Sequence, residues 1–116
     1  VPHHNPDKTK IKDMVLIDYG LKYRLYHADI TRCFFEKNEK KRPSFKMYEK
    51  IKDIAHEIVD EMPNLETAKD LAEFSEKLFK KRKVKKLIHL IGHGIGLDIH
   101  EKPLLSKASL DKLEGT

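Results

Sequence analysis

MVLIDYGLKYRLYHADITRCFF, residues 14–35, contains two apolar segments separated by a short polar one. The segments 14–21 and 25–35 are rich in β-branched and aromatic residues, which are typical of β-strands. Because the polar segment between them is short, the two strands are predicted to pair as an antiparallel hairpin. Each strand is interrupted by an aspartate, Asp18 in the first and Asp29 in the second.

The two aspartates raise a question of charge. If the hairpin is symmetric about its loop, Asp18 and Asp29 lie directly opposite each other, with Cβ atoms about 5 Å apart. Two carboxylates at that distance repel each other unless a cation lies between them or one keeps its proton. A third interpretation is an asymmetric turn that leaves one aspartate in solvent. The histidines downstream favour the cation, because divalent transition metals accept carboxylate and imidazole ligands together.

Two helices are predicted after the hairpin. Following the polar loop 38–43, Ser44 is expected to cap a helix that ends at Pro63. Thr67, with Asp70 three residues later, is expected to cap a second helix. The apolar positions with helical spacing are Met47, Tyr48, Ile51, Ile54, Ala55, Ile58, Val59 and Met62 in the first helix, and Leu71, Phe74, Leu78 and Phe79 in the second. Strands followed by helices predict an α+β fold.

LIHLIGHGIGLDIHEKP, residues 87–103, gathers three histidines and three glycines. His89 and His93 are four residues apart, but the glycines around His93 disfavour a helix and allow the backbone to approach a ligand closely. Their spacing matches neither a dinucleotide-binding fingerprint nor a P-loop. A histidine cluster that follows a paired-aspartate hairpin favours a functional site over isolated structural histidines.

Composition limits the classes of function. The chain has 116 residues, a net charge of +5 and one cysteine, Cys33, so it fits one small domain without an internal disulfide in a reducing compartment such as the cytoplasm. No apolar run approaches the roughly 18 residues that span a bilayer, so no membrane association is expected. The basic run 80–86 is interpreted as the solvated end of the second helix rather than as a nucleic-acid patch. We therefore expect no specific nucleic-acid partner.

Four motifs occur along the chain in this order: PHH at 2–4, VLIDYG at 15–20, DITR at 29–32 and HLIGHGIGLDIHEKP at 89–103. With eleven residues from the first aspartate to the second, they resemble the pita-bread metallopeptidases, which include methionine aminopeptidase, aminopeptidase P and Xaa-Pro dipeptidase (prolidase). The PHH and DITR forms and the additional His89 are more similar to the Xaa-Pro branch. The resemblance implies an α+β, partial pita-bread fold, with a curved antiparallel sheet covered by two helices.

The resemblance also implies the chemistry. Members of the family bind two divalent metal ions, often Mn²⁺ or Co²⁺ with Zn²⁺ or Fe²⁺ as alternatives, which share a bridging water. By position, Asp18 matches the aspartate that chelates one metal, and Asp29 matches the aspartate that bridges both. His93 matches the single imidazole ligand. His100 matches the histidine beside the scissile bond, and His89 matches a histidine that binds the substrate or positions the proline, so these two are the expected catalytic residues.

Further positions complete the comparison. His3 resembles a substrate-binding pocket histidine, with its neighbour His4 as the alternative. Family members carry two more glutamate ligands in strands after the HEKP motif, and neither Glu101 nor Glu114 is assigned to those positions. Residues 1–116 are therefore expected to form part of a catalytic domain, without the family's N-terminal domain and C-terminal strands. Alone, they are expected to bind metal weakly and not to cleave Xaa-Pro dipeptides.

The expected activity of the whole protein is metal-dependent hydrolysis of Xaa-Pro peptides, and a homodimer of the full-length protein is compatible with it. Two alternatives stay open. A methionine aminopeptidase would use the same metal ligands with a different pocket. A non-catalytic pita-bread domain would bind protein or nucleic acid, but such domains usually lose the ligands that this chain retains.

Overall fold

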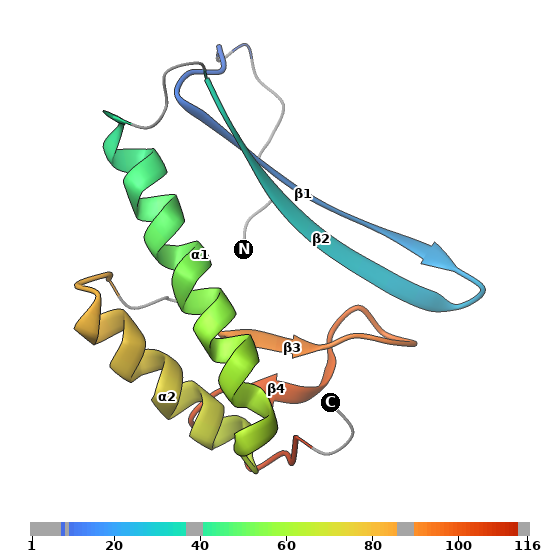
Figure 1. The fold of residues 1–116 in the computed structure, drawn as a ribbon. Helices are drawn as coiled ribbons and strands as arrows, with labels where there is room; N and C mark the ends of the chain where they lie inside the picture. Colours follow the sequence, from blue (N-terminus) through green and yellow to red (C-terminus); the bar gives the residue numbers. More distant parts are fainter. Residues whose placement is uncertain (1–7, 9, 37–40, 86–89, 114–116) are drawn as a thin grey trace.

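The computed structural model describes residues 8, 10–36, 41–85 and 90–113. The elements are β1 (Met14–Tyr23), β2 (Tyr26–Phe35), α1 (Pro43–Glu61), the short 3₁₀ helix η2 (Met62–Asn64), α2 (Ala68–Lys81), β3 (Gly92–Gly94) and β4 (Glu101–Leu105). Among the described residues, the strands form two antiparallel pairs, β1–β2 and β3–β4. Helices α1 and α2 lie side by side next to β3 and β4, and the β1–β2 hairpin extends away from them (Figure 1). The α+β prediction is confirmed.

The loop of the β1–β2 hairpin is centred one residue later than the arrangement that would place Asp18 opposite Asp29. Arg24 and Leu25 form it, with φ angles of 47° and 76°. Both angles lie in the left-handed region, as in a two-residue type I′ turn. This turn places Asp18 opposite Thr31. The prediction that Asp18 and Asp29 face each other directly is therefore wrong, although they share one face of the hairpin as diagonal neighbours, about 7 Å apart.

Helix α1 begins two residues earlier than predicted. Its N-cap is Arg42, which makes no capping hydrogen bond with its side chain, and Pro43 is the first helical residue. The predicted cap, Ser44, lies instead in the first turn, because proline suits the first helical position: its φ is already helical and it has no N–H to satisfy. The helix ends at Glu61, and Pro63 follows in η2, as the sequence predicted.

Helix α2 begins with the predicted capping box. The Asp70 N–H donates to Oγ1 of Thr67 at 3.2 Å, and the Thr67 N–H donates to Oδ2 of Asp70 at 3.0 Å. At the other end, Lys80 and Lys81 occupy the last turn, where cations interact favourably with the helix dipole. Within the described residues, no helix has the length and apolarity that crossing a membrane requires.

The buried core lies mainly between α1 and α2. Its members are Ile54, Ile58, Ala68, Leu71, Leu78, Phe79 and Leu113. Ile91 and Leu105, at the ends of the β3–β4 pair, pack against this cluster. The core therefore anchors β3 and β4 to the helices.

The apolar stripe predicted on α1 is buried only in part. Ile54 and Ile58 belong to the core, but Ile51 is 39% exposed and Val59 is 61% exposed. The reason is that α2 covers only one side of the stripe.

The open end of the hairpin is attached to the start of α1. Arg42 donates to Oδ1 of Asp13 at 2.9 Å and to Oε2 of Glu36 at 2.8 Å. The hydrogen bond from Arg42 lowers the pKa of Asp13 below its ordinary value. The ring of Phe35 packs edge-on against Phe45, with ring centroids 5.1 Å apart. These polar and aromatic contacts fix one end of the hairpin.

We expect Thr67→Ala to lower the free energy of unfolding by about 1 kcal/mol, because one helix N–H loses its acceptor. Thr67→Ser keeps the hydroxyl oxygen and is the matched control. Urea unfolding followed by circular dichroism measures both variants. Equal loss in the two variants would show that the lost methyl group, and not the capping box, matters at this position.

Candidate active site

The β3–β4 pair carries two of the histidines that the sequence singled out. His93 lies in β3 opposite Leu104, and His100 directly precedes β4. The register is irregular between His93 and Gly94, which lies opposite Glu101. The segment is extended rather than helical, as its glycines predicted.

The irregularity brings two backbones close together at Gly94. A Cβ atom on Gly94 would lie 2.6 Å from the carbonyl carbon of Lys102 and 2.9 Å from the carbonyl oxygen of Glu101. Both atoms belong to the backbone and cannot rotate away. Glycine is therefore required next to His93 by the closeness of β4.

The loop from Gly94 to His100 is folded onto the start of β4. The Gly96 N–H donates to the carbonyl oxygen of Asp98 at 3.1 Å, and the Asp98 N–H donates to Oε2 of Glu101 at 3.1 Å. The carboxylate carbon of Glu101 lies only 3.0 Å from the position that a Cβ on Gly96 would take. Glu101 thus braces the loop from one side.

His27 of β2 joins the hairpin to the other side of this loop, where the loop approaches β2 in Figure 1. Its backbone N–H donates to the carbonyl oxygen of Gly96 at 2.8 Å. Its ring Nδ1 lies 3.2 Å from the same oxygen. Because a carbonyl oxygen only accepts, the ring nitrogen that faces it carries the proton.

The contact between His27 and the carbonyl oxygen of Gly96, called the joint below, brings Asp29 close to His93. Oδ2 of Asp29 lies 3.6 Å from Nε2 of His93, and the two side chains are 32% and 22% exposed. Nδ1 of His93 donates to the carbonyl oxygen of Gly94 at 2.9 Å. That bond leaves Nε2, the other ring nitrogen, facing Asp29. The ring of His100 lies beside His93, with centroids 4.4 Å apart.

Asp18 lies on the same face of the hairpin and is oriented by its neighbour. Oγ1 of Thr31, directly across the hairpin, donates to Oδ1 of Asp18 at 2.8 Å. Gly20, opposite Asp29, contributes no side chain to this face, and a Cβ there would lie 3.3 Å from the carbonyl carbon of Ala28. The face between the two carboxylates is therefore open.

The donors of Asp29 and His93 fit part of a metal site. Two ligands about 2.1 Å from an ion in tetrahedral geometry lie about 3.4 Å apart, close to the 3.6 Å between Oδ2 and Nε2. The backbone hydrogen bond to Nδ1 is also typical of a metal-binding histidine. In the part of the chain that the structure describes, no three His, Cys, Asp or Glu side chains converge tightly enough to hold an ion. The donor set here is a partial one.

Three of the predicted histidine positions cannot be placed. His3 and its alternative His4, and also His89, lie outside the described residues. In the other direction, sequence reasoning missed His27 and Thr31. Both are two residues from Asp29, and the alternation of side chains along a strand was the signal that could have placed them on its face.

The outer edge of β4 is capped by a side chain. The backbone N–H of Leu104, the residue opposite His93, donates to Oδ2 of Asp111 at 3.1 Å. Nζ of Lys102 lies 3.1 Å from Oδ1 of the same carboxylate. The Leu104 N–H, Ser109 and Lys102 together lower the pKa of Asp111. Asp111 thus stabilises β4, the strand that pairs with β3 opposite His93.

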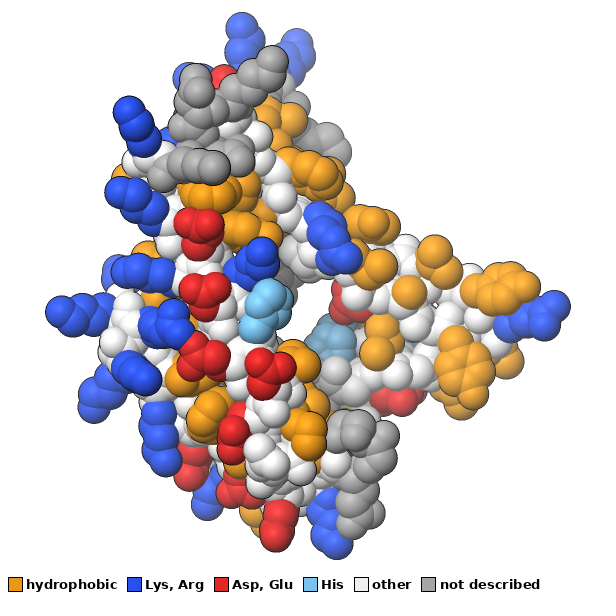
Figure 2. Space-filling model, in the orientation of Figure 1, with side chains coloured by type: hydrophobic (Ala, Val, Ile, Leu, Met, Phe, Trp, Pro, Cys, Tyr) orange, Lys and Arg blue, Asp and Glu red, His pale blue; other side chains and the backbone are white. Residues whose placement is uncertain are grey.

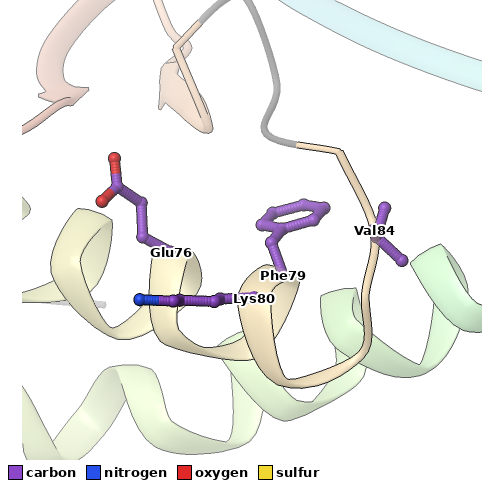
Figure 3. Close-up of a pocket in the computed structure, with 4 residues that line it drawn as sticks. All are labelled: Glu76, Phe79, Lys80 and Val84. Atoms are coloured by element: carbon purple, nitrogen blue, oxygen red, sulfur yellow. The ribbon is translucent and has the colours of Figure 1, made fainter.

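Several hollows occur on the described part of the molecule, and a cavity of about 570 Å³ beside β4, lined by Lys102, Leu104 and Asp111 among others, contains none of the candidate site residues. One hollow lies between the hairpin and the helices, with histidine and acidic side chains around it (Figure 2). Another, of about 280 Å³, lies at the end of α2, where Glu76 and Phe79 rise from the helix and Val84 comes from the segment after it (Figure 3). The lining of this last cavity, which Lys80 completes, includes no histidine. The candidate site is therefore the region around Asp29 and His93.

Comparison with known proteins identifies the family of the chain. Residues 1–115 match metallopeptidase family M24. The chain belongs to this family. Over 111 residues it is 36% identical to an uncharacterized peptidase of Methanocaldococcus jannaschii, covering 95% of this chain and 31% of that protein. Over 112 residues it is 34% identical to the Xaa-Pro dipeptidase of Pyrococcus furiosus, covering 92% of this chain and 31% of the dipeptidase.

Solved structures agree with the family M24 assignment. Prolidase from Pyrococcus furiosus superposes with a TM-score of 0.77 at 28% identity, covering 97% of this chain and 34% of the prolidase. Recombinant prolidase from Thermococcus sibiricus gives a TM-score of 0.75 at 29% identity, covering 94% and 30%. The M24 chain has the pita-bread fold predicted from its motifs, and it spans about a third of the length of these relatives.

We expect Gly94→Ala in this M24 chain to lower the free energy of unfolding by about 2–3 kcal/mol, because its Cβ meets backbone atoms of β4. Gly96→Ala is the matched variant. Its Cβ meets the flexible carboxylate of Glu101, which can rotate away, so we expect a loss of about 1 kcal/mol or less. Urea unfolding midpoints rank the two. A larger loss for Gly96→Ala would contradict the close approach at Gly94.

Proposed function

We propose that the complete protein hydrolyses Xaa-Pro peptide bonds with two divalent metal ions, and that residues 1–116 supply the ligands Asp18, Asp29 and His93. Membership of family M24 and the similarity to an Xaa-Pro dipeptidase and to prolidases support this proposal. The observation that carries it is the approach of Oδ2 of Asp29 to Nε2 of His93, at 3.6 Å, from two separate strand pairs.

The register of the hairpin supports a pair of ions rather than one. Asp18 and Asp29 are diagonal neighbours about 7 Å apart, which leaves room for ions separated by about 3.5–4 Å. Thr31 occupies one lone pair of Oδ1 of Asp18 and leaves the other oxygen available. When bound, two such ions, Mn²⁺ or Co²⁺ with Zn²⁺ or Fe²⁺ as alternatives, lower the pKa of a shared water toward about 7 and polarise the scissile carbonyl. Two glutamates outside residues 1–116 complete the proposed ligand set.

His100 is the proposed substrate-contacting residue within the described part of the site. Its ring centroid lies 4.4 Å from that of His93, so a peptide carbonyl beside the ligand is within its reach. An imidazole there donates a hydrogen bond to the substrate and exchanges protons near neutral pH. His89, as a second catalytic histidine, and His3, in the substrate pocket, keep the roles that their motifs imply. A cytoplasmic location and a homodimer remain predictions.

The test is Asp29→Ala in the complete protein, assayed with Met-Pro in the presence of Mn²⁺. We expect kcat/KM to fall by about a thousandfold or more, because a lost bridging ligand removes several kcal/mol of transition-state stabilisation. Calorimetric titration with Mn²⁺ is expected to show a matching loss of metal affinity. Asp60→Ala, which removes an exposed carboxylate on α1, is the control and should leave both values unchanged. Retained turnover in the Asp29 variant would refute the metallopeptidase proposal.

The substrate separates the remaining alternatives. We expect the complete protein to cleave Met-Pro in preference to Met-Ala-Ser. The opposite preference would assign it to the methionine aminopeptidases, with the same metal ligands. Binding of Mn²⁺ without cleavage of either peptide would favour a non-catalytic domain.

A further inference from the structure

His27 makes the contact that relates the aspartates to the histidines. Both of its N–H groups, on the backbone at 2.8 Å and on the ring at 3.2 Å, approach one acceptor, the carbonyl oxygen of Gly96. The residue lies in β2, two positions before Asp29. Side chains two positions apart on a strand share a face, so the ring of His27 and the carboxylate of Asp29 lie on the same side of the hairpin.

The contact between His27 and Gly96 lies next to the candidate ligand pair of Asp29 and His93, both along β2 and along the segment 93–96. Proceeding from His27 to Asp29 in β2, the partner changes from Gly96 back to His93. The two segments therefore run in opposite directions past each other. A displacement of Gly96 relative to His27 changes the separation of Asp29 and His93, because only one residue on β2 and two on the loop lie between the contacts.

The loop cannot take up such a displacement by itself. Its Gly96 N–H is bonded to the carbonyl oxygen of Asp98, and the Asp98 N–H is bonded to the carboxylate of Glu101. The same carboxylate fills the place of a side chain at Gly96. The loop is thus braced by β4 on one side and held by His27 on the other.

We infer that His27 is a positioning residue: its ring N–H holds the Gly96 carbonyl so that Asp29 and His93 stay at the separation that one metal ion can bridge. The inference rests on the proposed function of these two residues as ligands. His27 itself acts through the loop and contacts neither metal nor substrate. The requirement at this position is a hydrogen-bond donor at the place of Nδ1, not an imidazole.

The test uses two substitutions in the complete protein. His27→Phe keeps a ring and removes the donor. His27→Asn removes the imidazole and keeps an N–H at nearly the position of Nδ1. His56→Phe, at an exposed histidine on α1, is the matched control. Each protein is titrated with Mn²⁺ by calorimetry, and hydrogen exchange of the Gly96 and Asp98 amides is followed without metal.

We expect His27→Phe to weaken Mn²⁺ binding about three- to tenfold, the effect of one hydrogen bond, and to speed exchange of both amides by a similar factor. His27→Asn and the control should stay within about twofold of the unsubstituted protein in both measurements. At saturating Mn²⁺, the KM for Met-Pro and the pH profile of the Phe variant should be unchanged, because His27 neither binds the peptide nor transfers a proton.

Three results overturn the inference. In the first, the Asn variant behaves like the Phe variant, which would mean that the imidazole itself is needed. In the second, the Phe variant keeps its Mn²⁺ affinity. In the third, amide exchange in the Phe variant stays at the level of the unsubstituted protein. Failure of the proposed function is recognised separately. In that case the unsubstituted protein would not bind Mn²⁺, or Asp29→Ala would bind it with unchanged affinity. Amide exchange, measured without metal, still tests the contact between His27 and Gly96.

Discussion

Two hydrogen bonds from His27 to the carbonyl oxygen of Gly96 join the two strand pairs, and the geometry of the candidate site depends on this joint. The described core cluster lies around α1 and α2 and includes no residue of the hairpin. The hairpin is attached at its open end through Arg42 and Phe35, and near its turn through His27. The position of Asp29 is therefore set mainly by directional contacts at two places rather than by burial.

Close backbone approach is the second constraint, and it explains the glycines around His93. At Gly94 the neighbouring strand leaves no space for a side chain, and at Gly96 that space is taken by the carboxylate of Glu101. Glycine is the residue that permits both contacts without strain. The glycines thus allow the loop to lie close to β4 and to the hairpin, although they contribute no metal ligand themselves.

Much of this architecture could be predicted from sequence, because local signals decide it. The pair Thr67 and Asp70 defined the start of α2 correctly, since a capping box involves only adjacent residues. The hairpin register could not be predicted, because Arg24 and Leu25 adopt left-handed angles without the Asn-Gly or Asp-Gly pair that usually marks such a turn. His27 was missed for a related reason: a lone histidine in a strand gives no sign of its distant partner.

The two halves of the site differ in what holds them. His93 lies on a strand pair whose ends, at Ile91 and Leu105, pack on the helical core, so apolar burial fixes the histidine half. Asp29 lies on a hairpin whose other face is apolar yet exposed, as at Tyr19, which is 54% exposed, so burial contributes little to its position. Hydrophobic contacts are non-directional, whereas a hydrogen bond fixes both distance and angle. A ligand pair that must match the coordination distance of an ion within tenths of an ångström is therefore better controlled by the polar joint than by the core.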